Sequence, residues 1–372
     1  MEMRDQRLDT IAKNVLEHSL KINSGEKLLL EGPYAAKPLL HAFLDEAAKK
    51  GALAFVRLRD EEIARWLLQD STEQRMQTEI NWDLYALQDI DAYMQIDTQE
   101  NDAEFSGIDA SKMQLRAKVR RPWVDKVTNE KKWVLLNWPS KAQAQKAKMP
   151  YDEFCDFIID TCCVDYSEMG SRMLPLSELF SKTDRVHIKG PGTDLSFSIK
   201  GIPNVICAGE NNIPDGELFT APVRDSVEGV LTYNTPSPYH GKVYNGVRLE
   251  FKKGRIIRAS AENDTGRLNH IFETDEGARY IGEFALGLNP RIQRAFGNIL
   301  FDEKISGSFH FTPGSAYQND ADNGNRSNIH WDMVCIQTPE MGGGEIWFDG
   351  VLIRKDGRFV LPELLPLNPE SY

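Results

Sequence analysis

The sequence predicts an α/β fold in two parts: an N-terminal α/β domain with a mostly parallel sheet, and then a β-rich α+β domain. Over the first half of the chain, strand-like segments alternate with helical ones, the pattern of a parallel sheet covered by helices. From about residue 184 onward, strict alternation of apolar and polar residues is typical of half-buried antiparallel strands. At 372 residues the chain is longer than one hydrophobic core usually supports, so we expect two domains, at 1–183 and 184–372.

Helical spacing and short apolar runs define the elements of the N-terminal domain. Leu8 and Ile11 begin an apolar pattern of helical spacing that predicts a helix over residues 7–20. The turn Gly32-Pro33, after the first expected strand, lacks the glycine spacing of a dinucleotide site. The other expected elements are a strand at 27–31, a helix at about 36–50, and strands at 52–56, 92–96 and 133–137.

The C-terminal domain carries the signals of antiparallel hairpins. Residues 194–199 alternate strictly between apolar and polar side chains. Two turn signals, Lys252-Lys253-Gly254 and Asp349-Gly350, each lie between strand-like runs and predict hairpins. Helical stretches are few in this domain, and we expect the main one from Glu273 to Phe284.

Composition and charge narrow the class of protein. The net charge of −12 and the absence of a basic stripe argue against nucleic acid as a partner. No apolar run is long enough to span a bilayer, and the first residues lack the apolar core of a secretion signal. The cysteine count is odd and the spacing irregular, which argues against a disulfide framework and predicts a cytoplasmic protein. The cysteines are Cys155, Cys162, Cys163, Cys207 and Cys335.

Histidine and carboxylate residues in the C-terminal half form the most informative pattern in the chain. His330 and Asp332 are two residues apart, so on a strand both side chains would point to the same face. His310 lies in another alternating segment, and Glu217 and Glu283 add two carboxylates. Imidazoles and carboxylates that face one pocket suit a divalent transition metal, and five such ligands are enough for two ions.

Each of these residues also has a purely structural interpretation. A loop glutamate such as Glu217 is more often solvated than bound to metal, whereas Glu283 lies among small and apolar residues that indicate burial. A buried carboxylate must be paired, bound to metal or protonated. Glu303 can be an ordinary turn residue, and Tyr317 alone can be core packing. Because these residues occur together, a shared metal site is favoured over a separate structural explanation for each of them.

Taken together, these segments resemble the aminopeptidase T (thermophilic aminopeptidase) family of dinuclear metallopeptidases. The resemblance covers nearly the whole chain and is most specific in the C-terminal half. The motifs that carry it are Gly216 to Pro222, Glu273 to Ala278, Gly282-Glu283, Leu300 to Glu303, His310, Gly314 to Tyr317 and Ile329 to Met333, with looser matches at Gly190 to Leu195, Gly25 to Pro33 and Arg57 to Glu62.

The resemblance implies a homodimeric exopeptidase that acts on peptides with a free N-terminus and uses two divalent ions, Zn, Co or Mn. It implies Glu303 and Tyr317 as further active-site residues. In this chain the segment from Tyr317 to His330 is shorter than is usual in the family, and Glu303 lies farther before His310. These departures leave the shape of the substrate pocket open. The metal ligands that the resemblance implies are Glu217, Glu283, His310, His330 and Asp332.

The residues leave roles and alternatives open. Glu283 is either a metal ligand or the general base, and Tyr317 can donate a hydrogen bond to the tetrahedral oxyanion. His310, His330 and Asp332 by themselves would also suit a mononuclear Fe(II) ring-cleaving dioxygenase. The presence of Glu217 and Glu283 argues for two metals and against that alternative. A non-catalytic binding protein with a degenerate site is the third interpretation.

Overall fold

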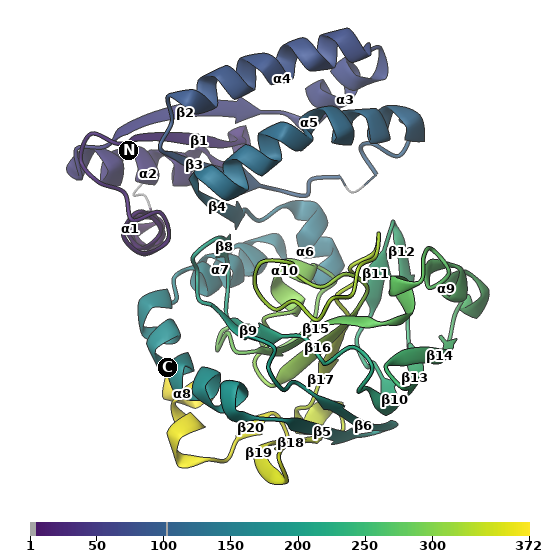
Figure 1. Cartoon of the computed structure of the whole chain (residues 1–372). Helices are drawn as coiled ribbons and strands as arrows, with labels where there is room; N and C mark the ends of the chain where they lie inside the picture. Colours follow the sequence, from purple (N-terminus) through teal and green to yellow (C-terminus); the bar gives the residue numbers. More distant parts are fainter. Residues whose placement is uncertain (1–4, 102) are drawn as a thin grey trace. The chain divides into compact units, whose positions relative to one another are not determined.

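The computed structural model describes residues 5–101 and 103–372 (Figure 1). The chain divides into two compact units, the first made of Met1–Asp165 with Gly209–Pro214 and the second of Tyr166–Ala208 with Asp215–Tyr372. The predicted fold class is confirmed, because the first unit holds a parallel sheet and the second is built on antiparallel sheets. The domain boundary at residues 183 and 184 stays a prediction, since compactness does not test whether either part folds alone.

A five-stranded sheet of order β2-β1-β3-β4-β8 forms the centre of the first unit. All of its neighbouring strands run parallel. The five predicted elements between residues 27 and 137 are all present. The strands are β1 (Lys27–Pro33), β2 (Leu53–Arg59), β3 (Ala92–Asp97), β4 (Lys132–Asn137) and β8 (Asn212–Ile213).

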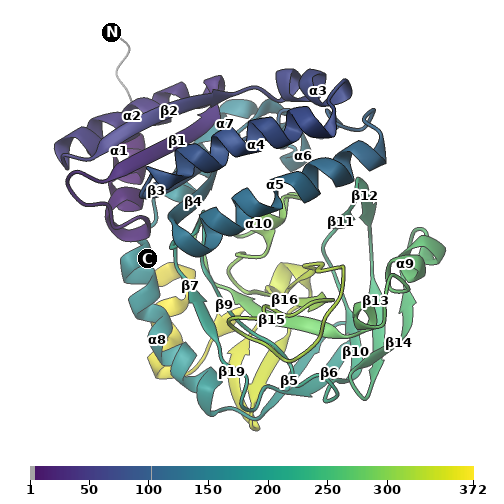
Figure 2. The ribbon, with the colours of Figure 1, turned by 45° about the horizontal axis from the view of Figure 1, so that its top comes forward.

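Helices pack on this sheet because its strands present apolar side chains on both faces. Leu29 and Tyr93 pack with Ile80 and Trp123 in one cluster, which places α4 and α5 on that face. Both views show these two helices side by side (Figures 1 and 2). The helices of this unit are α1 (Gln6–Asn14), which continues as a π-helical turn (Val15–Ser19), α2 (Lys37–Lys49), α3 (Glu61–Gln69), α4 (Glu73–Gln88), α5 (Ala110–Glu130), α6 (Lys141–Ala147) and α7 (Tyr151–Cys162).

Two antiparallel sheets form the second unit. The larger sheet has the order β14-β13-β10-β6-β5-β18-β19-β20, and the smaller one has the order β17-β16-β15-β9-β7. The strands of the larger sheet are β5 (Arg185–Gly190), β6 (Thr193–Ser198), β10 (Glu228–Thr232), β13 (Arg248–Lys252), β14 (Arg255–Ser260), β18 (Glu345–Phe348), β19 (Val351–Lys355) and β20 (Arg358–Phe359). Those of the smaller sheet are β7 (Val205–Cys207), β9 (Glu217–Thr220), β15 (Ile281–Gly287), β16 (Ser308–Pro313) and β17 (Val334–Ile336).

The remaining elements of the second unit are short, apart from one helix. They are α8 (Tyr166–Lys182), α9 (Thr265–Ile271), α10 (Ile299–Asp302) and the hairpin of β11 (Ser237–Tyr239) and β12 (Lys242–Tyr244).

Both predicted turns are confirmed. The turn Lys253-Gly254 joins β13 to β14, and Asp349-Gly350 joins β18 to β19. In each turn both residues have positive φ, which is the backbone conformation that matches the twist of a two-residue hairpin.

Aromatic side chains fill the core of the second unit between its two sheets. Phe197 of the larger sheet lies 5.0 Å, ring centre to ring centre, from both Phe284 and Phe311 of the smaller one. Phe180 of α8 stacks on Phe284 at 5.9 Å. One face of the smaller sheet is thereby committed to the core, and its other face is left for polar side chains.

The prediction of a helix from Glu273 to Phe284 is wrong. The segment holds a 3₁₀ turn at Gly277–Arg279 and then enters β15, whose seven residues are all buried. Because β15 pairs with β9 on one side and β16 on the other, long-range pairing overrides the local pattern.

The strand expected around His330 and Asp332 is also absent. His330 forms an isolated bridge with Gly314, and the residues after it are irregular. Within the described part of the chain, no helix combines the length and the apolar character needed to cross a bilayer.

Candidate active site and metal centre

Strand register brings three of the predicted ligands to one face of the smaller sheet. Glu217 of β9 lies opposite Gly287 of β15, and His310 of β16 lies opposite Ala285 of the same strand. Glu283 is two and four residues from these partners, so its side chain shares their face. All three side chains are buried, with exposed fractions of 7% or less. The neighbouring Phe284 points the other way, into the core.

Glu283 lies at the centre of the site, because its two oxygens face two different histidines. Oε1 lies 3.2 Å from His310 Nε2, and Oε2 lies 3.2 Å from His330 Nε2. Glu217 Oε2 is 3.4 Å from the same His310 nitrogen. Asp332 Oδ1 is 3.2 Å from His330 Nε2. The five predicted ligands therefore form two triads that share Glu283, and both have ligand atoms close enough together for one metal ion each.

Hydrogen bonds hold the second triad in place although its segment is irregular. His330 Nδ1 lies 2.8 Å from the carbonyl oxygen of Ser315. A donated proton there would leave Nε2 as the free lone pair that faces the carboxylates, which is the usual arrangement of a metal-binding histidine. Thr312 Oγ1 donates to Asp332 Oδ1 at 2.7 Å.

Among the buried polar atoms without a hydrogen-bond partner in the described residues, two lie within 3.4 Å of other ligands of the triads and suit metal coordination. They are Glu217 Oε2 and His330 Nε2, one from each triad. Leaving a buried polar atom without a partner costs about 1–3 kcal/mol, so such atoms call for an explanation. Nitrogen and carboxylate oxygen are the donors that zinc and similar divalent ions prefer. The residues present therefore fit a metal.

The electrostatics of the site also favour cations. Burial lowers the pKa of His310 and His330, but the hydrogen bonds and charges of the surrounding carboxylates outweigh it and raise the pKa to about 9 and about 11. Burial raises the pKa of Glu283 and Asp332, yet contacts with the histidines bring the pKa of both below the usual range. The site thus attracts positive charge, which protons supply when no other cation is present.

Lys304 is a buried residue of the candidate site that sequence reasoning missed. Its ammonium group is 1% exposed and lies 2.6 Å from both Glu217 Oε1 and Glu303 Oε1, and 3.6 Å from Asp215 Oδ1. Burial disfavours the charged form, but the three carboxylates raise its pKa well above the usual value. The signal for it was its place directly after Glu303 in a segment that also contributes to the family motif.

Lys304 also explains a third cluster of possible ligands. Cys207 and Asp215 lie near Glu217 with spacing that could hold an ion. The ammonium of Lys304 already occupies the carboxylate side of this cluster. It is therefore a weaker candidate for a metal than the two triads that share Glu283.

Glu303 and Tyr317 both lie beside the triads. Burial raises the pKa of Glu303 to about 8, against the lowering effect of Lys304. The Tyr317 ring lies 5.0 Å from the His330 ring and 5.3 Å from Phe219. Tyr317 is 46% exposed, and desolvation together with the charges of Glu283 and Asp332 raises the pKa of its phenol, which stays protonated.

Two further histidines have other contacts. His187 pairs with Asp194 on the adjacent strand at 2.6 Å, a partner that spacing in the sequence did not reveal. His240 stacks on Tyr239 in the turn between β11 and β12. The five cysteines are free thiols.

Comparison with known proteins places the chain in a family. The family described as thermophilic metalloprotease (M29) matches residues 4–359. The chain belongs to this family. It is therefore a metal-dependent hydrolase of peptide bonds. Aminopeptidase T of Thermus thermophilus is 26% identical, over 97% of this chain and 100% of its own length. Aminopeptidase 2 of Geobacillus stearothermophilus is 35% identical over 40% of this chain and 37% of its own.

A solved structure shares the fold of this M29 member. Wild-type AmpT from Thermus thermophilus superposes with a TM-score of 0.80 at 22% identity, covering 96% of this chain and 99% of its own. The predicted family is thus confirmed.

We expect Lys304→Met to destabilise the protein strongly. The change removes the ammonium and leaves Asp215, Glu217 and Glu303 without their buried cation, which should cost about 3 kcal/mol or more. Urea unfolding of the metal-free protein measures the loss. The matched control is Lys182→Met, whose side chain is 75% exposed and pairs with Glu178 at 3.6 Å. It should cost less than about 0.5 kcal/mol, and equal losses in the two variants would show that Lys304 has no special role.

Close packing against β15 gives a second prediction. A Cβ added at Gly287 would lie 2.3 Å from the Ile305 carbonyl oxygen and 2.9 Å from that of Glu303. Gly287→Ala should therefore push the segment that carries Glu303 and Lys304 off the sheet, at a cost of about 2 kcal/mol or more. Gly266→Ala in α9 meets open space and should be neutral or stabilising in the same thermal unfolding measurement. A Gly287→Ala protein as stable as the control would contradict the close approach.

Proposed function

We propose that this chain is an aminopeptidase that removes N-terminal residues from peptides with two divalent metal ions held in the site around Glu283. The observation that carries the proposal is that Glu283 directs one oxygen to each of two histidines. A carboxylate in that position can bridge two ions. The named relatives support the choice of an exopeptidase, because Aminopeptidase T and Aminopeptidase 2 are both so named.

The proposed ligands fall into two groups with Glu283 in common. Glu217 and His310 would hold one ion, and His330 and Asp332 would hold the other. Five carboxylates lie buried or nearly buried here, and three of them, Asp215, Glu217 and Glu303, pair with the Lys304 ammonium. With neutral histidines and with Glu303 ionised, the excess of four negative charges equals the charge of two divalent cations. Zinc, cobalt or manganese suits these nitrogen and oxygen donors.

The ions would lower the pKa of a bound water and polarise the scissile carbonyl. The protein must then accept a proton from the water and return one to the leaving amine. We assign this role to Glu303 and the role of ligand to Glu283, because both oxygens of Glu283 already face histidines. Lys304 holds one oxygen of Glu303 beside Glu217 at 2.6 Å and thereby orients the carboxylate.

Tyr317 supplies the remaining polar group. Its ring contacts His330 and Phe219, and its partial exposure leaves the hydroxyl within reach of a substrate. A protonated phenol can donate a hydrogen bond to the oxyanion that forms at the carbonyl in the transition state.

The two other interpretations have less support. A ring-cleaving dioxygenase needs one iron and leaves Glu217 without a role, and none of the comparisons favours it. A non-catalytic binding protein would have no need of all five ligands. A cytoplasmic location and a homodimeric assembly complete the proposal, and they rest on the family resemblance and the free thiols.

Metal-dependent exopeptidase activity is the direct test of this function. The protein should release leucine from peptides that begin with leucine. It should not cleave the same peptides after N-acetylation, since the free amine is then missing. Exhaustive chelation should abolish turnover, and zinc, cobalt or manganese should restore it. Full turnover by protein shown to be metal-free would refute the proposal.

Substitution of a ligand should separate the site from the rest of the chain. His330→Ala should cut kcat by several orders of magnitude. His18→Ala is the matched control, because His18 lies in the first unit near Glu210 at 4.0 Å and contributes nothing to the site. That variant should retain wild-type turnover and lose less than about 0.5 kcal/mol of stability. Equal activity of the two variants would mean that the site is misplaced.

Tyr317→Phe tests the oxyanion donor alone, because it removes only a hydroxyl. The value of kcat should fall about 100-fold with KM and metal content little changed, since the hydrogen bond acts mainly in the transition state. Steady-state kinetics with a metal assay on the same sample measure this. Normal turnover would remove Tyr317 from the mechanism.

A further inference from the structure

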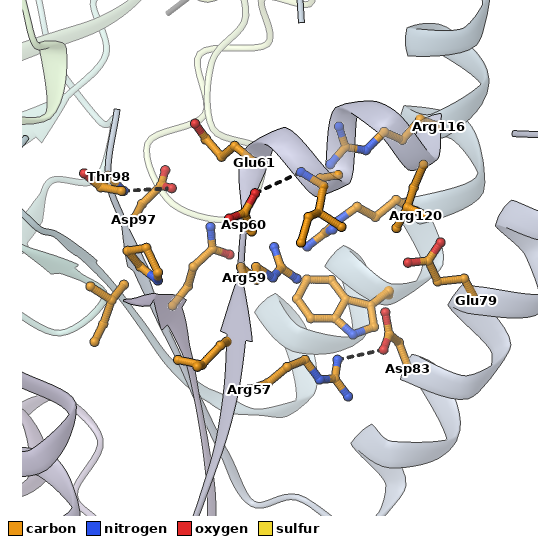
Figure 3. Close-up of a pocket in the computed structure, with 18 of the residues that line it drawn as sticks. Arg57, Arg59, Asp60, Glu61, Glu79, Asp83, Asp97, Thr98, Arg116 and Arg120 are labelled. Carbon is orange, nitrogen blue, oxygen red and sulfur yellow. Dashed lines mark hydrogen bonds and ion pairs between the residues drawn. The ribbon is translucent and has the colours of Figure 1, made fainter. Parts of the chain in front are cut away.

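A pocket in the first unit carries charges that the proposed peptidase site does not use. It has a volume of about 1640 Å³ and lies among β2, β3, α3, α4 and α5 (Figure 3). All of its lining residues belong to the first unit. Its lining includes several carboxylates and five arginines, namely Arg57, Arg59, Arg75, Arg116 and Arg120.

Two of these arginines lack an acidic partner. Arg57 pairs with Asp83 at 2.7 Å, and Arg59 pairs with the fully buried Glu31. Arg116 and Arg120, by contrast, form no ion pair or hydrogen bond with any residue in the described part of the chain. They lie four residues apart on α5 and so share one face of the helix.

The two unpaired guanidinium groups are held in place by aromatic rings. Arg116 lies 5.2 Å from the ring centre of Phe105, and Arg120 lies 4.5 Å from that of Trp123. Burial and then the charge of Arg59 lower the pKa of both, and the carboxylates that oppose this, Glu79 and Glu61 for Arg116 and Glu31 for Arg120, do not outweigh it. Figure 3 shows Arg59, Arg116 and Arg120 converging from the strand and the helix. Such a group of guanidinium ions suits a carboxylate, which can accept two hydrogen bonds from one of them.

The opposite wall of the pocket carries carboxylates. The carboxylate of Asp97, at the end of β3, accepts a hydrogen bond only from the backbone N–H of Thr98 among the described residues, and Glu61 makes no ion pair there. Burial raises the pKa of both carboxyl groups, and the charges of Arg116 near Glu61 and of Arg59 near Asp97 do not outweigh it. In Figure 3 these two side chains lie together, across the pocket from Arg116 and Arg120. A positively charged group would stabilise them.

Exposed apolar side chains line the space around these charges. Leu58, Ile63 and Trp82 all line the pocket and are 56%, 59% and 72% exposed. Exposed apolar side chains gathered around charged groups are typical of a binding site rather than of ordinary surface.

We propose that this pocket binds a short peptide as a zwitterion, with its carboxylate on Arg116 and Arg120 and its ammonium group towards Asp97 and Glu61. The arrangement of charges suits any zwitterion of this size and does not depend on the proposed function. The choice of a peptide as that zwitterion rests on the proposed function. The pocket is larger than the roughly 300–1,000 Å³ usual for small-molecule sites, which favours a peptide over a single amino acid. Its apolar lining would receive the peptide side chains.

Calorimetric binding of dipeptides to the full-length protein tests this proposal. The His330→Ala background prevents turnover. The probes are Leu-Leu, Leu-Leu amide, which lacks the anion, and N-acetyl-Leu-Leu, which lacks the cation. Leu-Leu should bind saturably and each blocked form at least tenfold more weakly. Arg116→Gln should weaken the binding of Leu-Leu at least tenfold. It should leave the binding of Leu-Leu amide unchanged, because the amide lacks the carboxylate that Arg116 would bind.

The opposite wall supplies the second variant, and the same helix supplies the control. Asp97→Asn should weaken Leu-Leu at least tenfold and leave N-acetyl-Leu-Leu unchanged, so the test stands even if Arg116→Gln fails to fold. Arg121→Gln should bind like the parent, because Arg121 is 73% exposed and pairs with Asp125. Absence of saturable binding would overturn the proposal. So would equal effects of Arg116→Gln on Leu-Leu and its amide, or unchanged Leu-Leu binding in both pocket variants. Absence of peptidase activity in the wild-type protein, with intact Leu-Leu binding in the His330→Ala background, would count against the proposed function alone.

Discussion

The shared position of Glu283 is the constraint on which the second unit depends. One buried carboxylate faces two histidines, and four further carboxylates crowd around them. Like charges at this density would repel one another strongly in a water-poor environment. The fold compensates in part with the Lys304 ammonium, which is itself buried. The negative charge that remains must be balanced by cations, which are either protons or metal ions.

The smaller sheet satisfies this constraint by separating its two faces. Phe284 and Phe311 fill the core against the larger sheet, while Glu283 and His310, next to them in sequence, turn to the opposite face. Alternation along a strand thus sets reactive groups directly on a rigid apolar layer. Gly287 completes the arrangement, because the absence of a side chain lets the segment with Glu303 and Lys304 cross the sheet closely.

Much of the fold was visible in the sequence, and the failures have physical causes. The strands of the first unit and both hairpin turns follow from local patterns. These are apolar runs and turn-forming residues that adopt positive φ in the structure. The segment from Glu273 to Phe284 does not, because β15 exists through pairing with strands distant in sequence. The candidate ligands were predicted from motifs, yet Lys304 was missed, since a lysine beside a glutamate suggests a surface position until its burial is known. Nor could spacing reveal that His330 and Asp332 converge from an irregular segment rather than a strand.

The most direct test of the central claim is a count of bound metal in the wild-type protein and in three variants. Because Glu283 would serve both ions, Glu283→Ala should weaken both sites, whereas His310→Ala and His330→Ala should each remove one. Titration of the metal-free proteins with zinc, followed by calorimetry and elemental analysis, should give about two ions for the wild type and about one for each histidine variant. The Glu283 variant should bind least. A wild-type protein that takes up a single ion, or a Glu283→Ala protein that keeps two with unchanged affinity, would contradict the account.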